Sequence, residues 1–161
     1  MNVLFVGAGH DAGKQWEGYE VTRLDIDPST NPDIVGSMTS MGEIGPFDAV
    51  YCSHSLEHLY PHEVPTALSE FFRVLKPGGR AVVLVPDLEG VPPTDDELPD
   101  APGMCGLHLF YGDARLIPDH PYMAHHSGFV QSTLRAAMEA AGFKTETKRM
   151  SYYNLMAIGV R

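Results

Sequence analysis

The sequence has few basic residues, few cysteines and no long apolar run. Lysine and arginine together number 11 against 21 aspartate and glutamate residues, so the formal net charge is −10. This deficit argues against unassisted binding to nucleic acid or to an anionic membrane surface, because contacts to phosphate need clustered basic side chains. No apolar stretch approaches the roughly 20 residues that a membrane-spanning helix needs. We therefore expect neither a nucleic-acid partner nor a membrane partner.

The two cysteines, Cys52 and Cys105, have the spacing of neither a metal site nor a disulfide framework. Both thiols are expected to be reduced, which predicts a cytoplasmic protein. Residues 1–6 are apolar but lack the basic start and the cleavage site of a signal peptide. We therefore expect them to form a first, buried strand.

The rest of the sequence alternates between strand-like and helix-like segments. A chain of 161 residues with 43% hydrophobic residues suits a single domain, residues 1–161. Alternating strands and helices predict an α/β fold with a mostly parallel sheet. The expected strands are 2–6, 20–25, 34–35, 47–52, 81–85, 144–150 and 153–160, and the expected helices are 12–16, 61–75 and 130–141. The turn between the last two strands is so short that this pair must be antiparallel.

One long segment, at about residues 86–128, shows no clear period and is rich in proline, glycine, aspartate and histidine. Strand-like sequence resumes after it, which favours a functional loop over a linker. We expect this segment to close over the substrate.

A glycine-rich turn, Gly7-Ala8-Gly9, directly follows the first predicted strand. Glycine lets the backbone turn sharply and lets a ligand touch the main chain. The segment fits the dinucleotide pattern G-x-G-x-x-G/A, and it also fits the shorter turn that cradles the amino-acid part of S-adenosylmethionine (SAM). Asp25, at the end of the second strand, is the preferred partner for the ribose hydroxyls in either case. The competing residue is Asp27, which precedes a proline and would otherwise cap a turn.

Two segments distinguish between these cofactors: F-D-A-V-Y-C-S-H-S-L-E-H-L at 47–59 and F-F-R-V-L-K-P-G-G-R at 71–80. Together they resemble class I SAM-dependent methyltransferases, which carry F-D-x-V, L-E-H-L and R-V-L-K-P-G-G in this order. The likeness is greatest to small bacterial predicted methyltransferases of the methyltransferase type 11-like group. Their further S-H-x-L-E-H, V-P-D-L-E and H-P-Y…H…S-G-F segments have counterparts at 53–58, 85–89 and 120–129.

The resemblance implies a Rossmann-like three-layer sandwich with a seven-stranded, mostly parallel sheet in the order 3-2-1-4-5-7-6, strand seven being antiparallel. It also implies methyl transfer from SAM to a small-molecule acceptor, with the ligands outside the carboxyl ends of the strands. Carried over by position, the cofactor residues are Gly7, Ala8 and Gly9 at the methionine part, Asp25 and Ile26 at the ribose, Ser37 and Met38 at the adenine, and Cys52 and Ser53 at the methyl end.

The chain departs from the family pattern at three positions. Phe5 stands where an acid often precedes the first glycine, Asp11 replaces the third glycine, and Ser37 stands where the adenine position often carries aspartate. The helices that usually cover one side of the cofactor are also missing at the N-terminus. Either the site is open for a bulky substrate or another subunit covers it, in which case we expect a homodimer.

Histidines are the candidate catalytic residues. Methyl transfer is an in-line displacement that the protein assists by positioning, and an oxygen or nitrogen acceptor also needs a base to take its proton. His54 is the first candidate because it follows the fourth strand, and His125 lies in the predicted closing segment. His58 is the third candidate, with a backbone-bonded histidine at a helix start as the alternative interpretation.

Residues 54–58 also match H-x-x-E-H, a zinc-protease signature. That chemistry needs both histidines on one helical face and a third ligand. A strand runs directly into this motif and Pro61 places the helix after it, so we predict no protease and no metal ligands here. A divalent metal in a methyltransferase site is an open alternative without specific support in the sequence.

Two further functions stay open at this stage. A SAM-binding partner subunit with weak catalysis of its own would explain the altered first motif and the small size. An NAD-dependent oxidoreductase would explain the match to G-x-G-x-x-A, but the chain leaves little room for a substrate domain.

Overall fold

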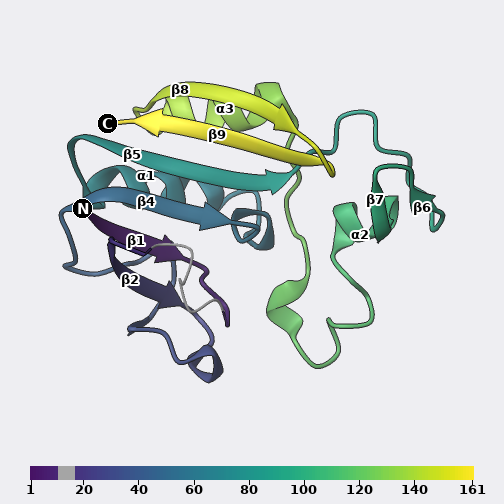
Figure 1. Cartoon of the computed structure of the whole chain (residues 1–161), viewed down its shortest axis with the longest axis horizontal. Coiled ribbons are helices and arrows are strands. Elements are labelled where there is room, and N and C mark those ends of the chain that lie inside the picture. The colour runs from purple at the N-terminus through teal and green to yellow at the C-terminus, as the bar shows by residue number, and fades with distance from the viewer. Residues whose placement is uncertain (11–16) are drawn as a thin grey trace.

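The computed structural model describes residues 1–10 and 17–161, and its main feature is one seven-stranded sheet (Figure 1). The strands are β1 (Asn2–Val6), β2 (Glu20–Asp25), β3 (Ile34–Val35), β4 (Phe47–Ser53), β5 (Leu75–Pro86), β8 (Lys144–Met150) and β9 (Asn154–Val160). Their order across the sheet is β3-β2-β1-β4-β5-β9-β8. β9 is antiparallel to β5 and β8, whereas the pairs from β3 to β5 are parallel. The predicted Rossmann-like sheet is thereby confirmed. The helix expected at 12–16 lies outside the described residues.

Two helices, α1 (Val64–Val74) and α3 (Gln131–Ala140), lie side by side behind the sheet in Figure 1. The buried residues of α1 recur at helical spacing, and they are Val64, Ala67, Leu68, Phe71 and Val74. Leu134 and Met138 of α3 join them in the same core. The central strands β1 and β4 contribute completely buried apolar residues to this core, as buried parallel strands do.

Two elements have other boundaries in the structure than the sequence predicts. The helix expected at 61–75 begins at Val64, because residues 61–63 form a turn and Pro65, not Pro61, occupies the first helical turn. The strand expected at 81–85 is the longer β5. Its register against β4 shifts between Phe47 and Ala49, so that the motif L-K-P-G-G forms an irregular bulge at its start.

The segment predicted as a loop at about 86–128 contains regular structure. It includes β6 (Glu97–Leu98), which pairs with β7 (Ala101–Cys105), and the short helix α2 (Gly106–Tyr111). These elements have a small apolar core of their own, made of Val91, Leu98, Ala101 and Leu109. The sequence did not reveal them because elements this short complete too few periods of a hydrophobic pattern.

None of the helices in the described part of the chain has both the length and the apolar character needed to cross a bilayer.

Candidate functional site

The glycine turn after β1 is held against the end of β4. Gly7 adopts φ +64° and its amide donates a hydrogen bond of 2.9 Å to the carbonyl of Leu24. A Cβ atom at this position would lie 2.1 Å from Oγ of Ser55 and 2.4 Å from its Cβ. The Ser55 hydroxyl in turn donates to the carbonyl of Gly7 at 3.2 Å. The turn therefore requires glycine at position 7 both for its backbone conformation and for its close approach to Ser55.

Asp25 connects the end of β2 to this turn. Its carboxylate accepts one hydrogen bond from the amide of Gly9 at 2.7 Å and another from the amide of Asp27 at 2.9 Å. Asp27 instead caps a short 3-10 helix by accepting from the amide of Ser29, and this contact holds the pKa of Asp27 below its usual value. The two acids thus have different local roles, and it is Asp25 that lies beside the glycine turn.

The further residues expected at the ribose and the adenine follow β2 and β3. Ile26 follows Asp25 directly and is 49% exposed, which is unusual for an isoleucine. Ser37 and Met38 are half-buried after β3, and the hydroxyl of Ser37 is 2.8 Å from that of Thr39.

The carboxyl end of β4 brings Cys52, Ser53 and His54 to the same edge of the sheet. The Cys52 side chain is buried in the core, and this burial raises the pKa of its thiol, so the thiol is not available to a ligand. Ser53 is half-buried. His54 adopts φ +48°, a left-handed conformation that is uncommon for residues other than glycine. Its side chain is 48% exposed.

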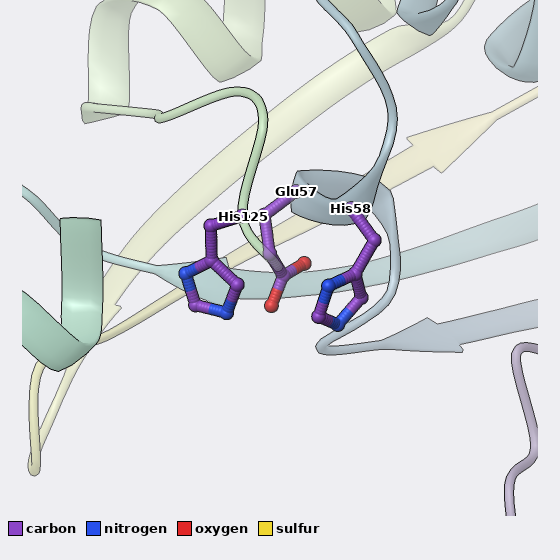
Figure 2. A group of neighbouring side chains, drawn as sticks. All are labelled: Glu57, His58 and His125. Carbon is purple, nitrogen blue, oxygen red and sulfur yellow. The ribbon is translucent and has the colours of Figure 1, made fainter. Parts of the chain in front are cut away.

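Two residues after this strand, Glu57 and His58, form a compact cluster with His125 from a distant segment (Figure 2). One nitrogen or oxygen atom each from Glu57, His58 and His125 lies within 4.8 Å of the other two. Glu57 and His58 belong to a 3-10 helix, Leu56–His58, and the imidazoles of His58 and His125 flank the Glu57 carboxylate in Figure 2. His54 lies before this helix, so His54 and His58 do not share a helical face.

Backbone hydrogen bonds fix the two segments of this cluster to each other. The amides of His126 and Ser127 donate to the carbonyl of Glu57 at 2.9 and 3.0 Å. The ring nitrogens of His58 lie 3.0 Å from the carbonyl oxygen of Ala124 and 3.1 Å from that of His54. His58 therefore has the backbone contacts that its alternative interpretation predicted.

The Glu57 carboxylate and burial shift the pKa values of two neighbouring histidines, His54 and His125. Its side chain is 1% exposed, and Nδ1 of His54 lies 3.5 Å from Oε1 of Glu57. This carboxylate raises the pKa of His54 above its ordinary value, against the opposing effect of burial. Burial lowers the pKa of His125. The sequence interpretation considered Glu57 only as the base of a protease, and its burial had no sequence signal because a 3-10 helix of three residues shows no periodicity.

A pocket of about 380 Å³ opens in front of the cluster. Its wall includes residues from the end of β4, the segment 86–128 and the β8–β9 turn. Among them are His54, Glu57, His58, Met104, His108, Asp113, Met123, His125, Tyr152 and Asn154. Tyr152 and Tyr153 adopt φ of +59° and +54°, so the turn that lines this pocket holds two successive residues in a disfavoured conformation. The pocket lies at the carboxyl ends of β4 and β5, where open α/β sheets bind ligands.

The chain is similar in sequence to known methyltransferases. A protein family described as a methyltransferase domain matches residues 6–148. The chain is 33% identical over 117 residues to the ubiquinone/menaquinone biosynthesis C-methyltransferase UbiE of Escherichia fergusonii, a match that covers 69% of this chain and 43% of that protein. The chain thus matches less than half the length of this relative.

Solved structures show the same fold at low sequence identity. A SAM-dependent methyltransferase from Mesorhizobium loti has a TM-score of 0.71 at 17% identity, with 99% of this chain and 90% of that chain covered. The 1,6-didemethyltoxoflavin-N1-methyltransferase of Burkholderia thailandensis, solved with S-adenosylhomocysteine, has a TM-score of 0.66 at 17% identity, with 99% and 70% covered.

Proposed function

This chain belongs to the methyltransferase domain family, and on that premise we propose that it transfers the methyl group of SAM to a small-molecule acceptor. The observation that carries the proposal is that the glycine turn and Asp25 follow β1 and β2 at the same carboxyl edge of the sheet at which the pocket opens after β4 and β5. β1 and β4 are the strands between which the order of the sheet reverses, so a cofactor bound here would lie next to an acceptor in the pocket.

The proposed cofactor site follows the edge of the sheet. Gly7, Ala8 and Gly9 would hold the amino-acid part of SAM through their backbone, and Asp25 and the exposed Ile26 would hold the ribose. Ser37 and Met38 would hold the adenine. At the methyl end the contacts come from Ser53 and from the backbone of Cys52, because the Cys52 side chain is buried.

His54 is the proposed catalytic residue at the acceptor end. Its Nδ1 faces Glu57 and the Asn154 side chain is a second partner of the ring, so Nε2 would have to turn from Asn154 to accept a hydrogen bond from the acceptor and then its proton. Bound SAM would supply the methyl group, which would pass from its sulfur to the acceptor atom. His58 and His125 position this end of the pocket through the cluster with Glu57. The acceptor is a metabolite small enough for a pocket of about 380 Å³.

Calorimetric titration with SAM and S-adenosylhomocysteine tests the cofactor assignment. We expect micromolar binding of both, no binding of NAD, and a loss of about tenfold to hundredfold in affinity for Asp25→Ala, because a hydrogen bond to a charged group contributes about 1.5–3 kcal/mol. Asp27→Ala is the matched control and should bind SAM normally, since Asp27 only caps a turn. Binding of NAD in place of SAM would instead support an oxidoreductase.

Turnover of the His54→Gln variant tests the acceptor end. Acceptors are first found by screening small metabolites for release of S-adenosylhomocysteine. With an acceptor in hand, His54→Gln should lower kcat by about 10²–10⁴-fold, the usual contribution of a general base, and leave SAM affinity unchanged. An unchanged kcat would remove His54 from the mechanism.

A cytoplasmic location and a homodimer remain proposals. The buried, unpaired cysteines Cys52 and Cys105 support the first, since a reducing compartment keeps thiols free. The exposed apolar side chains of Tyr111, Leu116, Tyr122 and Met123 in the segment 86–128 support the second. Light scattering of the purified chain would separate dimer from monomer, and a SAM-binding chain that turns over only with a second protein would favour the partner-subunit function.

A further inference from the structure

We propose that Glu57, His58 and His125 form a binding site for one divalent transition-metal ion, of the Zn²⁺ or Fe²⁺ type, in the wall of the acceptor pocket. Two imidazoles and one carboxylate form the ligand set that such ions prefer when they keep coordination positions open. The three candidate ligand atoms lie within 4.8 Å of one another. Ligand atoms held about 2.0–2.2 Å from one tetrahedral ion lie about 3.5 Å apart, so binding would draw the three side chains together by up to roughly 1 Å.

The first observation behind this site is the Glu57 carboxylate. Its side chain is 1% exposed, and neither of its oxygens has a hydrogen-bond partner among the residues that the structure describes. His54 approaches only Oε1, and at 3.5 Å its contact is longer than a normal hydrogen bond. A buried carboxylate without donors is unfavourable unless a cation neutralises it. His54 can bring a positive charge to Oε1, but only at 3.5 Å and from a half-exposed ring, whereas a metal ion between the two imidazoles would contact the carboxylate directly.

The second observation is the orientation of His125. Its Nδ1 lies 2.9 Å from the carbonyl oxygen of Leu109, to which it donates its hydrogen. The neutral ring then has an unprotonated Nε2, and this atom lies on the side of the Glu57 carboxylate in Figure 2. Histidines that bind metals typically donate their other ring N–H to a backbone carbonyl or a carboxylate, which fixes the tautomer. The contact with Leu109 gives His125 this arrangement before any ion binds.

The third observation concerns His58, whose ring has fewer N–H groups than its contacts with carbonyl oxygens require. Both of its ring nitrogens face backbone carbonyls, at 3.0 Å and 3.1 Å, yet a neutral imidazole has only one N–H. One nitrogen therefore faces a carbonyl oxygen with its lone pair. A turn of the ring that directs this nitrogen from the carbonyl to a metal ion would remove the mismatch and leave the other nitrogen as the donor to a carbonyl. A second proton on His58 would also remove it, but the Glu57 oxygens would still lack hydrogen bonds.

The site deepens the proposed function and rests on it, because the same cluster lines the acceptor pocket. Three protein ligands leave at least one coordination position open toward the pocket. That position suits an oxygen donor of the acceptor, such as a hydroxyl that becomes more acidic beside the ion. The inference therefore favours acceptors with a hydroxyl group next to the atom that is methylated, or with that hydroxyl as the methylated group itself.

Metal titration of the whole chain tests the site without any need for a known acceptor. Protein treated with chelator and dialysed is titrated with Zn²⁺ by calorimetry and with Co²⁺ by visible absorption, which reports the coordination number. We expect one ion per chain. In Glu57→Gln and in His125→Ala the affinity for the ion should fall by at least about 10–100-fold. His126→Ala is the matched control, because its ring stacks on Tyr60 outside the cluster and should not affect the affinity.

Two results would overturn the metal site. One is the absence of stoichiometric binding, and the other is binding that Glu57→Gln and His125→Ala leave unchanged, which would place the ion on surface histidines. Circular dichroism of each metal-free variant verifies that it is folded. SAM titrations run in parallel distinguish the two proposals. Binding of SAM without binding of metal would overturn only the metal site, whereas failure to bind SAM would overturn the proposed function.

Discussion

Replacement of Gly7 by alanine is expected to lower the free energy of unfolding by about 3 kcal/mol and to abolish SAM binding. Alanine at φ +64° is strained, and its Cβ would overlap the Ser55 side chain at 2.1 Å from Oγ. Left-handed strain contributes about 1–2 kcal/mol and overpacking about 1–3 kcal/mol. Urea denaturation followed by circular dichroism measures the loss of stability, and calorimetry measures the loss of SAM binding.

Gly9→Ala provides the control for this variant. Gly9 has a similar φ of +53°, but a Cβ added there would meet no atom within 4 Å in the described part of the structure. Its expected loss is therefore the strain alone, about 1–2 kcal/mol. The double variant Gly7→Ala/Ser55→Gly removes the overlap. Its loss of unfolding free energy should therefore be smaller than the sum of the losses in the two single variants. Equal losses for Gly7→Ala and Gly9→Ala would mean that Ser55 moves aside without cost.

Replacement of Glu57 by methionine is expected to have opposite effects on stability and on activity. In metal-free protein the variant should be more stable by about 1–3 kcal/mol, because methionine fills a similar volume and removes a buried carboxylate whose oxygens lack hydrogen bonds. Methyl transfer should fall by at least about 10²-fold, since the variant removes the charge that faces Nδ1 of the proposed base His54 and one of the three ligands of the proposed metal site. Residues kept for function at the expense of stability are common in active sites.

Chemical denaturation of chelator-treated protein and the S-adenosylhomocysteine release assay measure these two effects. Glu139→Met is the control, because Glu139 is exposed on α3 and surface substitutions change stability by about 0.5 kcal/mol or less. Addition of Zn²⁺ should stabilise the wild-type chain and leave Glu57→Met unaffected. A Glu57→Met variant less stable than the wild type would show that the carboxylate has favourable partners in solution.

The sequence by itself determined the sheet and the first half of the site. Local patterns predicted the elements themselves, namely the apolar segments of β1, β4 and β5 and the helical spacing of α1. The family resemblance then predicted the order of the strands in the sheet. The turn at Gly7 and the acid at Asp25 follow their strands directly, and the carboxyl ends of neighbouring parallel strands meet at one edge. Their proximity therefore followed from the topology alone, and the 2.7 Å bond from Gly9 to Asp25 agrees with it.

The second half of the site was decided only by the tertiary structure. His54, His58 and His125 were candidates because of their residue type, but no pattern placed Glu57 between two imidazoles or buried it. That placement depends on hydrogen bonds from the backbone amides of His126 and Ser127 to the carbonyl of Glu57. Nearly every residue has such an amide, so the residue types at these positions do not predict the contact. The segment 86–128 likewise orders around a small core of its own, through elements too short to be periodic. Contacts between irregular segments distant in sequence have no local signature, so the side-chain cluster at the proposed acceptor end appears only when the chain is folded.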